Sequence, residues 1–240
     1  MLRRSSVNAR WATANTQCSS RQINYSSGQP QVFKTSHHPS FKRDHQFRLV
    51  DIALATSAAP AYFPRHTFNN NQYVDGGLYA NAPGLLADHE AQTFFRQPSE
   101  TVHLLSIGTM SSKFTANPGR NRDGEPMTGE ASTPQIRPSV SLDYPYQFLE
   151  SLSDFMLRHR LPGRYIHIDE TLTDERASAV ALDKADRPAK EALLGAASEQ
   201  SKFWLGKDEF QPFLAHRSSP PQFFYGPNAT QGSRENAETE

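Results

Sequence analysis

Asp75-Gly76-Gly77 is the part of the sequence whose residue types and spacing could do chemistry. The run Gln72-Tyr-Val before it predicts a short strand, so the Asp75 carboxylate stands where a strand ends. In open α/β sheets, sites form just outside the carboxyl ends of strands. The two glycines would let the backbone turn back sharply, and an aspartate with an ordinary pKa of about 3.9 could act as a base if a burial or a short hydrogen bond assisted it.

Asp-Gly-Gly is also a common turn sequence, and other reactive residue types have plain structural explanations. His37, His38 and His45 could be metal ligands, but no helical histidine pair accompanies them, so a solvated loop is expected. His103 and His167 lie in apolar runs and are expected to be satisfied core histidines. We therefore expect no metal and no cofactor.

Composition excludes several classes of protein. The 240 residues carry 25 basic and 25 acidic side chains, so the balanced charge argues against a nucleic-acid partner. The single cysteine, Cys18, excludes a disulfide framework. The mean hydropathy is −0.67, and neither a transmembrane run nor a signal peptide is recognisable. The expected location is the cytoplasm, with peripheral contact to membranes.

The elements that must position the aspartate follow from apolar spacing. Strands alternate with helices, which predicts an α/β layered fold. A helix opening near Pro83 is expected to be capped by Asn81 and to turn Leu85 inward. The strands are expected at 31–35, 72–74, 103–109 and 165–168, and the other helices at 49–59, 144–160 (Phe148, Leu152 and Phe155 on its inner side) and 184–205.

The surroundings of Asp75 resemble a known family. Residues 53–64 read ALATSAAPAYFP, and residues 73–83 read YVDGGLYANAP. Both stretches are similar, in order and spacing, to the C-terminal half of the patatin-like phospholipase (PNPLA) domain, with LLSIGT at 104–109 as weaker support. The resemblance spans 24–205 and implies a partial three-layer α/β sandwich, a mostly parallel sheet flanked by helices.

The resemblance implies a serine acyl hydrolase that uses a Ser–Asp dyad without a catalytic histidine. Asp75 matches the dyad base, and Gly76 and Gly77 match the turn of the motif. Ser57 matches a family position at a helix end and is not the nucleophile. The implied substrates are phospholipids or acylglycerols at a membrane surface, and the implied chemistry needs no cofactor.

The family's nucleophile stands in a Gly-x-Ser-x-Gly turn, and these 240 residues contain no such pattern. The nearest pairing, Gly108-Thr-Met-Ser111, lacks the second glycine and follows Asp75 in the chain. Gly28 is the only glycine before Asp75, so no glycine-rich oxyanion loop precedes it. We expect the C-terminal half of the domain alone, with an open sheet edge and exposed apolar helix faces that a second copy or a partner covers.

The expected organisation is a disordered or truncated arm at 1–22, the patatin-like half domain at 23–215 with a long loop at 117–138, and a flexible tail at 216–240. Three functions stay open. The first is a lipid acyl hydrolase whose serine is encoded upstream, which we favour for the family. The second is a catalytically inactive relative that binds lipid or protein, favoured for the chain as it stands. The third is an unrelated α/β interaction module in which Asp-Gly-Gly is only a turn.

Overall fold

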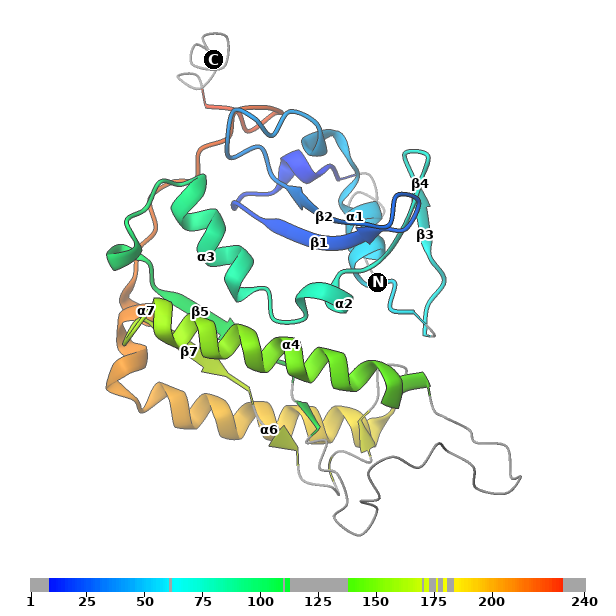
Figure 1. Ribbon diagram of the computed structural model, residues 1–240. Helices are drawn as coiled ribbons and strands as arrows, with labels where there is room; N and C mark the ends of the chain where they lie inside the picture. The colour runs from blue at the N-terminus through cyan, green and yellow to red at the C-terminus, as the bar shows by residue number, and fades with distance from the viewer. Residues whose placement is uncertain are drawn as a thin grey trace, which may run out of the picture.

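The computed structural model describes residues 9–60, 62–109, 111–112, 138–169, 171–172, 176, 179–180 and 184–230. The described strands form one four-stranded sheet and two two-stranded sheets, and Figure 1 shows the two long helices α4 (Pro138–Arg160) and α6 (Arg187–Leu205) below the larger sheet. The expected loop at 117–138 lies outside the described residues, apart from Pro138 at the start of a helix.

The larger sheet has four strands in the order β2-β1-β4-β3, and every neighbouring pair is antiparallel. The expectation of a mostly parallel sheet is therefore wrong for the main sheet. The chain makes this sheet from two hairpins, and the β3–β4 hairpin closes through Asn69 and Asn70, which both have positive φ. Asparagine tolerates that backbone region, and such two-residue turns match the twist of paired strands. The strands are β1 (Ser19–Asn24), β2 (Gln29–Lys34), β3 (His66–Phe68) and β4 (Asn71–Asp75).

Helix α1 (Leu49–Thr56) packs on the larger sheet and closes the first core. Phe33 has no exposed surface, and its ring lies 5.4–5.6 Å from the rings of Phe47, Phe68 and Tyr73. Edge-on and tilted aromatic packing of this kind adds to the hydrophobic free energy of burial. Trp11 joins the same core from the short helix η1 (Trp11–Thr13).

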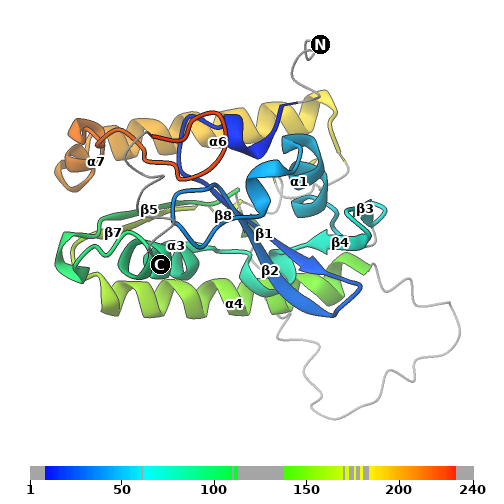
Figure 2. The same cartoon turned by 90° about the horizontal axis from the view of Figure 1, so that it is seen from above.

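The second sheet is parallel, as the apolar runs predicted. It consists of β5 (Leu104–Ile107) and β7 (Tyr165–Ile168), and a third sheet, also parallel, consists of β6 (Ser111–Ser112) and β8 (Thr171–Leu172). Seen from above, β5 and β7 lie between α6 (Arg187–Leu205) on one side and α3 (Gly84–Thr93) with α4 (Pro138–Arg160) on the other (Figure 2). The remaining elements are α2 (Gly77–Ala80), α7 (Gln211–Ala215), η2 (Asp44–Gln46), η3 (Ser99–Thr101) and η5 (Asp208–Phe210).

Two helices present a different face to the core from the one predicted. Within 148–160, the part of α4 whose burial is described, the buried side chains are Ser153 and Leu157, whereas Phe148 and Phe155 are 73% and 60% exposed. The prediction that Phe148, Leu152 and Phe155 lie on the inner side of this helix is therefore wrong. On α3 the buried residues are Gly84, Asp88 and Glu90, while Leu85 is half-buried. The spacing of apolar residues cannot predict that polar side chains such as Asp88 and Glu90 are buried.

The N-terminal cap of α3 differs from the prediction. Asn81 follows the short α2 and is not the cap of α3, because Pro83 takes the cap position and no side chain caps it. By contrast, Asp186 caps α6, since its Oδ1 accepts a hydrogen bond from the Ala189 N–H at 2.9 Å.

Both described ends of the chain contact the first core region. The backbone N–H of Trp11 donates to Phe47 O at 2.8 Å. Near the other end, Phe223 is 5% exposed, and the Tyr225 hydroxyl donates to Pro39 O at 2.6 Å. The division of the chain at residues 22 and 215 stays a prediction.

Candidate functional site

Asp75 is the last residue of β4, at the point where the chain leaves the larger sheet. It lies opposite Gln22 of β1, and its backbone N–H donates to Ala58 O at 3.0 Å. The buried pair Ala58 and Ala59 follows α1, so the small residues of this stretch let α1 end close against β4. Two segments that are far apart in the sequence, 53–60 and 71–77, thus meet at the aspartate.

The carboxylate of Asp75 is held by the chain that follows it. Its Oδ1 accepts a hydrogen bond of 2.7 Å from the backbone N–H of Gly77. The side chain is half-buried. This bond uses one of the acceptor sites of the carboxylate, and Oδ2 is a further acceptor for a reacting group.

The two glycines are needed for space and not for a left-handed backbone. Gly76 has φ −75° and ψ −8°, in the ordinary helical region. A Cβ at Gly76 would lie 2.6 Å from the backbone carbonyl atoms of Arg21, because β1 passes directly over the turn. A Cβ at Gly77 would lie 3.3 Å from Asp75 Oδ1. The residues Asp75, Gly76 and Gly77 therefore form one close-packed turn, in which the absence of a side chain at Gly76 allows the approach of β1.

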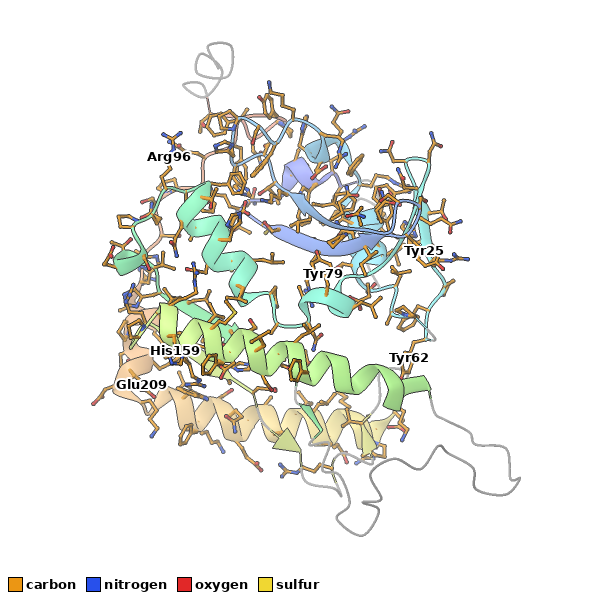
Figure 3. All side chains as sticks on the ribbon, viewed as in Figure 1. Tyr25, Tyr62, Tyr79, Arg96, His159 and Glu209 are labelled. Carbon is orange, nitrogen blue, oxygen red and sulfur yellow. The ribbon has the colours of Figure 1, made fainter. Side chains whose placement is uncertain are left out.

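Arg21 of β1 connects this turn to its neighbours. Its backbone O accepts a hydrogen bond from Thr56 Oγ1 at 2.6 Å, and its guanidinium donates to Asn81 O at 3.2 Å. Tyr79 of α2, labelled in Figure 3 beside β1, donates from its hydroxyl to Gln31 O at 3.3 Å. The Tyr79 bond joins α2 to β2, and the Thr56 bond joins the end of α1 to β1.

A cavity of about 420 Å³ opens beside the turn, between the larger sheet and the β5 strand. Asp75 is not among the residues that line it, whereas Arg21 belongs to both. Its lining combines cationic, hydroxyl and apolar groups from β1, β2, α3 and β5: Gln17, Cys18, Ser19, Arg21, Val32, Lys34, His37, Pro83, Gly84, Leu86, Ala87, Glu90, Phe95 and 104–107. The arrangement can accept a partly polar ligand of small to medium size.

An ion-pair network borders the cavity. Glu90 of α3 accepts hydrogen bonds from Lys34 Nζ at 2.6 Å and from His37 Nε2 at 2.8 Å. His37 Nδ1 lies 2.7 Å from Thr35 Oγ1, and the Lys34 ammonium lies 3.9 Å from the Phe94 ring centre. Burial acts to raise the pKa of Glu90, but the bonds and charges of His37 and Lys34 outweigh it, so this pKa lies below its ordinary value.

The other candidate residues lie elsewhere. Ser57 is exposed, and its hydroxyl donates to Ala53 O at 2.8 Å. His38 Nδ1 lies 2.8 Å from Ser40 Oγ, and the His45 ring stacks on Tyr225. The expectation that His103 belongs to the core is wrong, because it is exposed.

Burial raises the pKa of the Cys18 thiol, so this group is not an activated nucleophile.

Sequence reasoning missed a group of side chains beside the second sheet whose types can bind a metal ion. Glu150, His167 and Asp169 each place one ligand atom within 4.8 Å of the others. His167 and Asp169 are two residues apart at the end of a strand and so point to the same face. The spacing of two residues in the sequence could have indicated that His167 and Asp169 share a face. Glu150 lies 17 residues before His167, so the sequence does not show that it joins them.

No helix in the described part of the chain is long and apolar enough to cross a membrane.

Comparison with known proteins assigns a family to the segment that carries Asp75. Residues 8–88 match the patatin-like phospholipase family. This match begins before residue 24, where the resemblance was expected to start, and the restriction to a C-terminal half domain stays a prediction.

Parts of the chain are also similar to individual proteins that are named as phospholipases. A cGAMP-activated phospholipase of Pseudomonas aeruginosa is 39% identical over 208 residues, which cover 86% of this chain and 60% of that protein. A cGAMP-activated phospholipase of Vibrio cholerae is 31% identical over 172 residues, covering 68% of this chain and 48% of that protein. A human calcium-independent phospholipase A2-gamma is 35% identical over 68 residues, covering 28% of this chain and 9% of that protein. The chain thus spans 60% and 48% of the two bacterial relatives.

Proposed function

We propose, on the premise that residues 8–88 match the patatin-like phospholipase family, that the protein is a lipid acyl hydrolase with Asp75 as the base of a Ser–Asp dyad. The proposed substrates are phospholipids or acylglycerols presented at a membrane surface. The observation that carries the proposal is the position of Asp75 at the end of β4, with Oδ1 held by Gly77 N–H at 2.7 Å inside the matched segment. The names of the bacterial relatives support the same activity.

The proposed reaction is two-step acyl transfer. A serine hydroxyl gives its proton to Asp75 Oδ2 while its oxygen attacks the ester carbonyl carbon. The tetrahedral intermediate expels the alcohol, which takes the proton from Asp75, and an acyl-serine remains. Water then attacks the acyl-serine, again through Asp75, and the fatty acid leaves as the serine regains its proton. These 240 residues contain no Gly-x-Ser-x-Gly, so we propose that the serine comes from outside them.

Gly76 and Gly77 have a positioning role in this proposal. The Gly77 N–H orients the carboxylate, and Gly76 lets the turn lie against the Arg21 backbone. A carboxylate is a weak base toward a hydroxyl, so its placement within hydrogen-bond distance of the serine supplies much of its effect.

The experiment compares the full-length product of the gene with its Asp75→Asn variant on phosphatidylethanolamine–phosphatidylglycerol vesicles, with release of free fatty acid as the readout. Asparagine keeps an oxygen that can accept the Gly77 N–H, so the melting temperature should stay unchanged. Hydrolysis should fall by about 10²–10⁴-fold, the usual contribution of a general base. Asp208→Asn, at an exposed site in η5, is the matched control and should keep full activity.

The same assay tests regulation. Since the two bacterial relatives are named as cGAMP-activated phospholipases, we propose that cGAMP raises hydrolysis here too, and linear dinucleotides of the same bases serve as controls. If the Asp75→Asn variant kept its hydrolytic activity, Asp75 would not be the base of the reaction. Absence of hydrolysis by the full-length protein, with and without cGAMP, would instead favour a catalytically inactive binding module.

A further inference from the structure

Helix α4 and strand β7 bring three metal-ligating side chains together on the second sheet, away from Asp75. Glu150 comes from α4, His167 from β7, and Asp169 from the residue that follows β7. One ligand atom of each lies within 4.8 Å of the other two. The Glu150 and His167 side chains are only 19% and 13% exposed.

The imidazole of His167 is oriented by a carboxylate. Asp154, one helical turn after Glu150 on α4, has its Oδ1 3.1 Å from His167 Nδ1. An ionised carboxylate only accepts, so the proton of a neutral imidazole sits on Nδ1, and Nε2 keeps a free electron pair. A carboxylate–histidine pair of this kind is the usual arrangement behind a metal-binding histidine.

Nε2 of His167 lacks a hydrogen-bond partner among the described residues, although it is buried from solvent. Glu150 Oε1 lies 3.9 Å from this nitrogen, which is too far for a hydrogen bond but suits two ligands of one ion. An orphaned buried nitrogen costs free energy unless something binds it. This observation is independent of the clustering of the acidic groups.

Gly108 keeps space for the third ligand. It follows β5, and its backbone N–H donates to Ile168 O at 2.8 Å, which places it beside Asp169. A Cβ at this position would overlap with the Asp169 carboxylate. Ionised carboxylates at Glu150 and Asp169 repel each other at this distance, and a cation between them would relieve the repulsion.

We propose that Glu150, His167 and Asp169 bind one divalent transition-metal ion, Zn²⁺ or Mn²⁺, which fastens α4 to β7. One imidazole nitrogen with two carboxylates is a donor set that these ions accept, whereas Ca²⁺ and Mg²⁺ prefer oxygen ligands alone. Three protein ligands leave further positions for water. The ion is structural in this proposal and has no part in ester hydrolysis.

The test is isothermal titration calorimetry of the full-length protein after removal of metals with a chelator, using ZnCl₂, MnCl₂ and MgCl₂ separately. We expect about one equivalent of Zn²⁺ or Mn²⁺ per chain and much weaker binding of Mg²⁺. His167→Gln and Glu150→Gln should each abolish this binding. Asp154→Asn should weaken it by about 10–100-fold, because it removes only the partner that orients the imidazole.

His159→Gln is the matched control, since His159 lies on the same helix but is exposed and bonds only locally, to Phe155 O at 2.8 Å. Its place near the end of α4 is labelled in Figure 3. It should bind metal like the unchanged protein. Co²⁺ gives a second readout, because its visible absorption bands should appear on binding and be lost in His167→Gln but not in His159→Gln.

Fastening of α4 predicts a rise in melting temperature with added Zn²⁺ or Mn²⁺ that follows the measured affinity. Gly108→Ala, which deletes no ligand, should lower the affinity by displacing Asp169. Equal binding by the unchanged protein, His167→Gln and Glu150→Gln would overturn the site, as would the absence of saturable binding. Circular dichroism of the metal-free variants checks that each loss of binding occurs in a folded chain.

Discussion

The carboxylate of Asp75 and the backbone N–H of Gly77 form a hydrogen bond of 2.7 Å across the turn that ends β4. The bond requires the chain to fold back within two residues, and Gly76 between them lies against the Arg21 backbone. The turn 75–77 therefore fixes both the orientation of the Asp75 carboxylate and the contact of this turn with β1.

Gly76→Ala should therefore be more damaging than Gly77→Ala. The new methyl group at position 76 meets backbone atoms of Arg21 at 2.6 Å, which cannot move without shifting β1. We expect a loss of about 3 kcal/mol in the free energy of unfolding for Gly76→Ala and about 1 kcal/mol or less for Gly77→Ala. Urea denaturation of both variants measures the difference. Equal losses would mean that β1 can move away from the turn.

Glu90 should make stability depend on pH in the acidic range. Its pKa in the folded state lies below the ordinary 4.5, so folding favours the ionised form. That contribution is present above pH 4.5 and disappears as the pH falls from 4.5 through the lowered pKa. Glu90→Gln should lower stability near neutral pH, by about 1–3 kcal/mol, and should differ less from the unchanged protein in acid.

Thermal melts between neutral and acidic pH measure this convergence. Glu191→Gln is the control, because Glu191 pairs with Arg187 on the exposed face of α6 and should change the profile little. If the difference in melting temperature between Glu90→Gln and the unchanged protein stayed constant with pH, the lowered pKa of Glu90 would be contradicted.

Arg160 should matter more than its partial exposure suggests. Its Nε donates at 2.8 Å to Asp88, whose side chain is 1% exposed, so Arg160→Met leaves a buried carboxylate with one remaining donor, Gln92. We expect a loss of about 2 kcal/mol, below the full cost for a buried pair because the guanidinium is half-exposed. Arg187→Met breaks a largely exposed pair, with Glu191, and should cost less than about 0.5 kcal/mol. Urea denaturation of both variants gives the comparison.

Local patterns predicted much of the fold. The apolar runs at 103–109 and 165–168 were correctly expected as strands, and they pair in parallel. Helix α1 ends at Thr56, close to the predicted stop before Pro60. The Asp75 turn was found because its residue types and its family resemblance are both local in sequence.

What failed depended on contacts between distant segments. Strand β1 reads SSRQIN, and no apolar pattern marks it, yet Gln22 has no exposed surface and its amide donates to Gln31 O at 3.0 Å. Without β1, the antiparallel character of the main sheet could not be deduced. Likewise, the outward side of α4 carries Phe148 and Phe155, so apolar spacing chose the wrong face. The cluster around His167 needs a helix and a strand to meet, which spacing alone does not reveal.

The two tryptophans give the protein optical probes in two different parts of the fold. Trp11 is buried among the aromatic rings under α1, whereas Trp204, near the end of α6, lies 6.1 Å from the Phe210 ring. These are the only tryptophans in the 240 residues. Intrinsic fluorescence therefore carries one signal from each sheet region, and variants with a single tryptophan would reveal whether the two regions unfold together or in sequence.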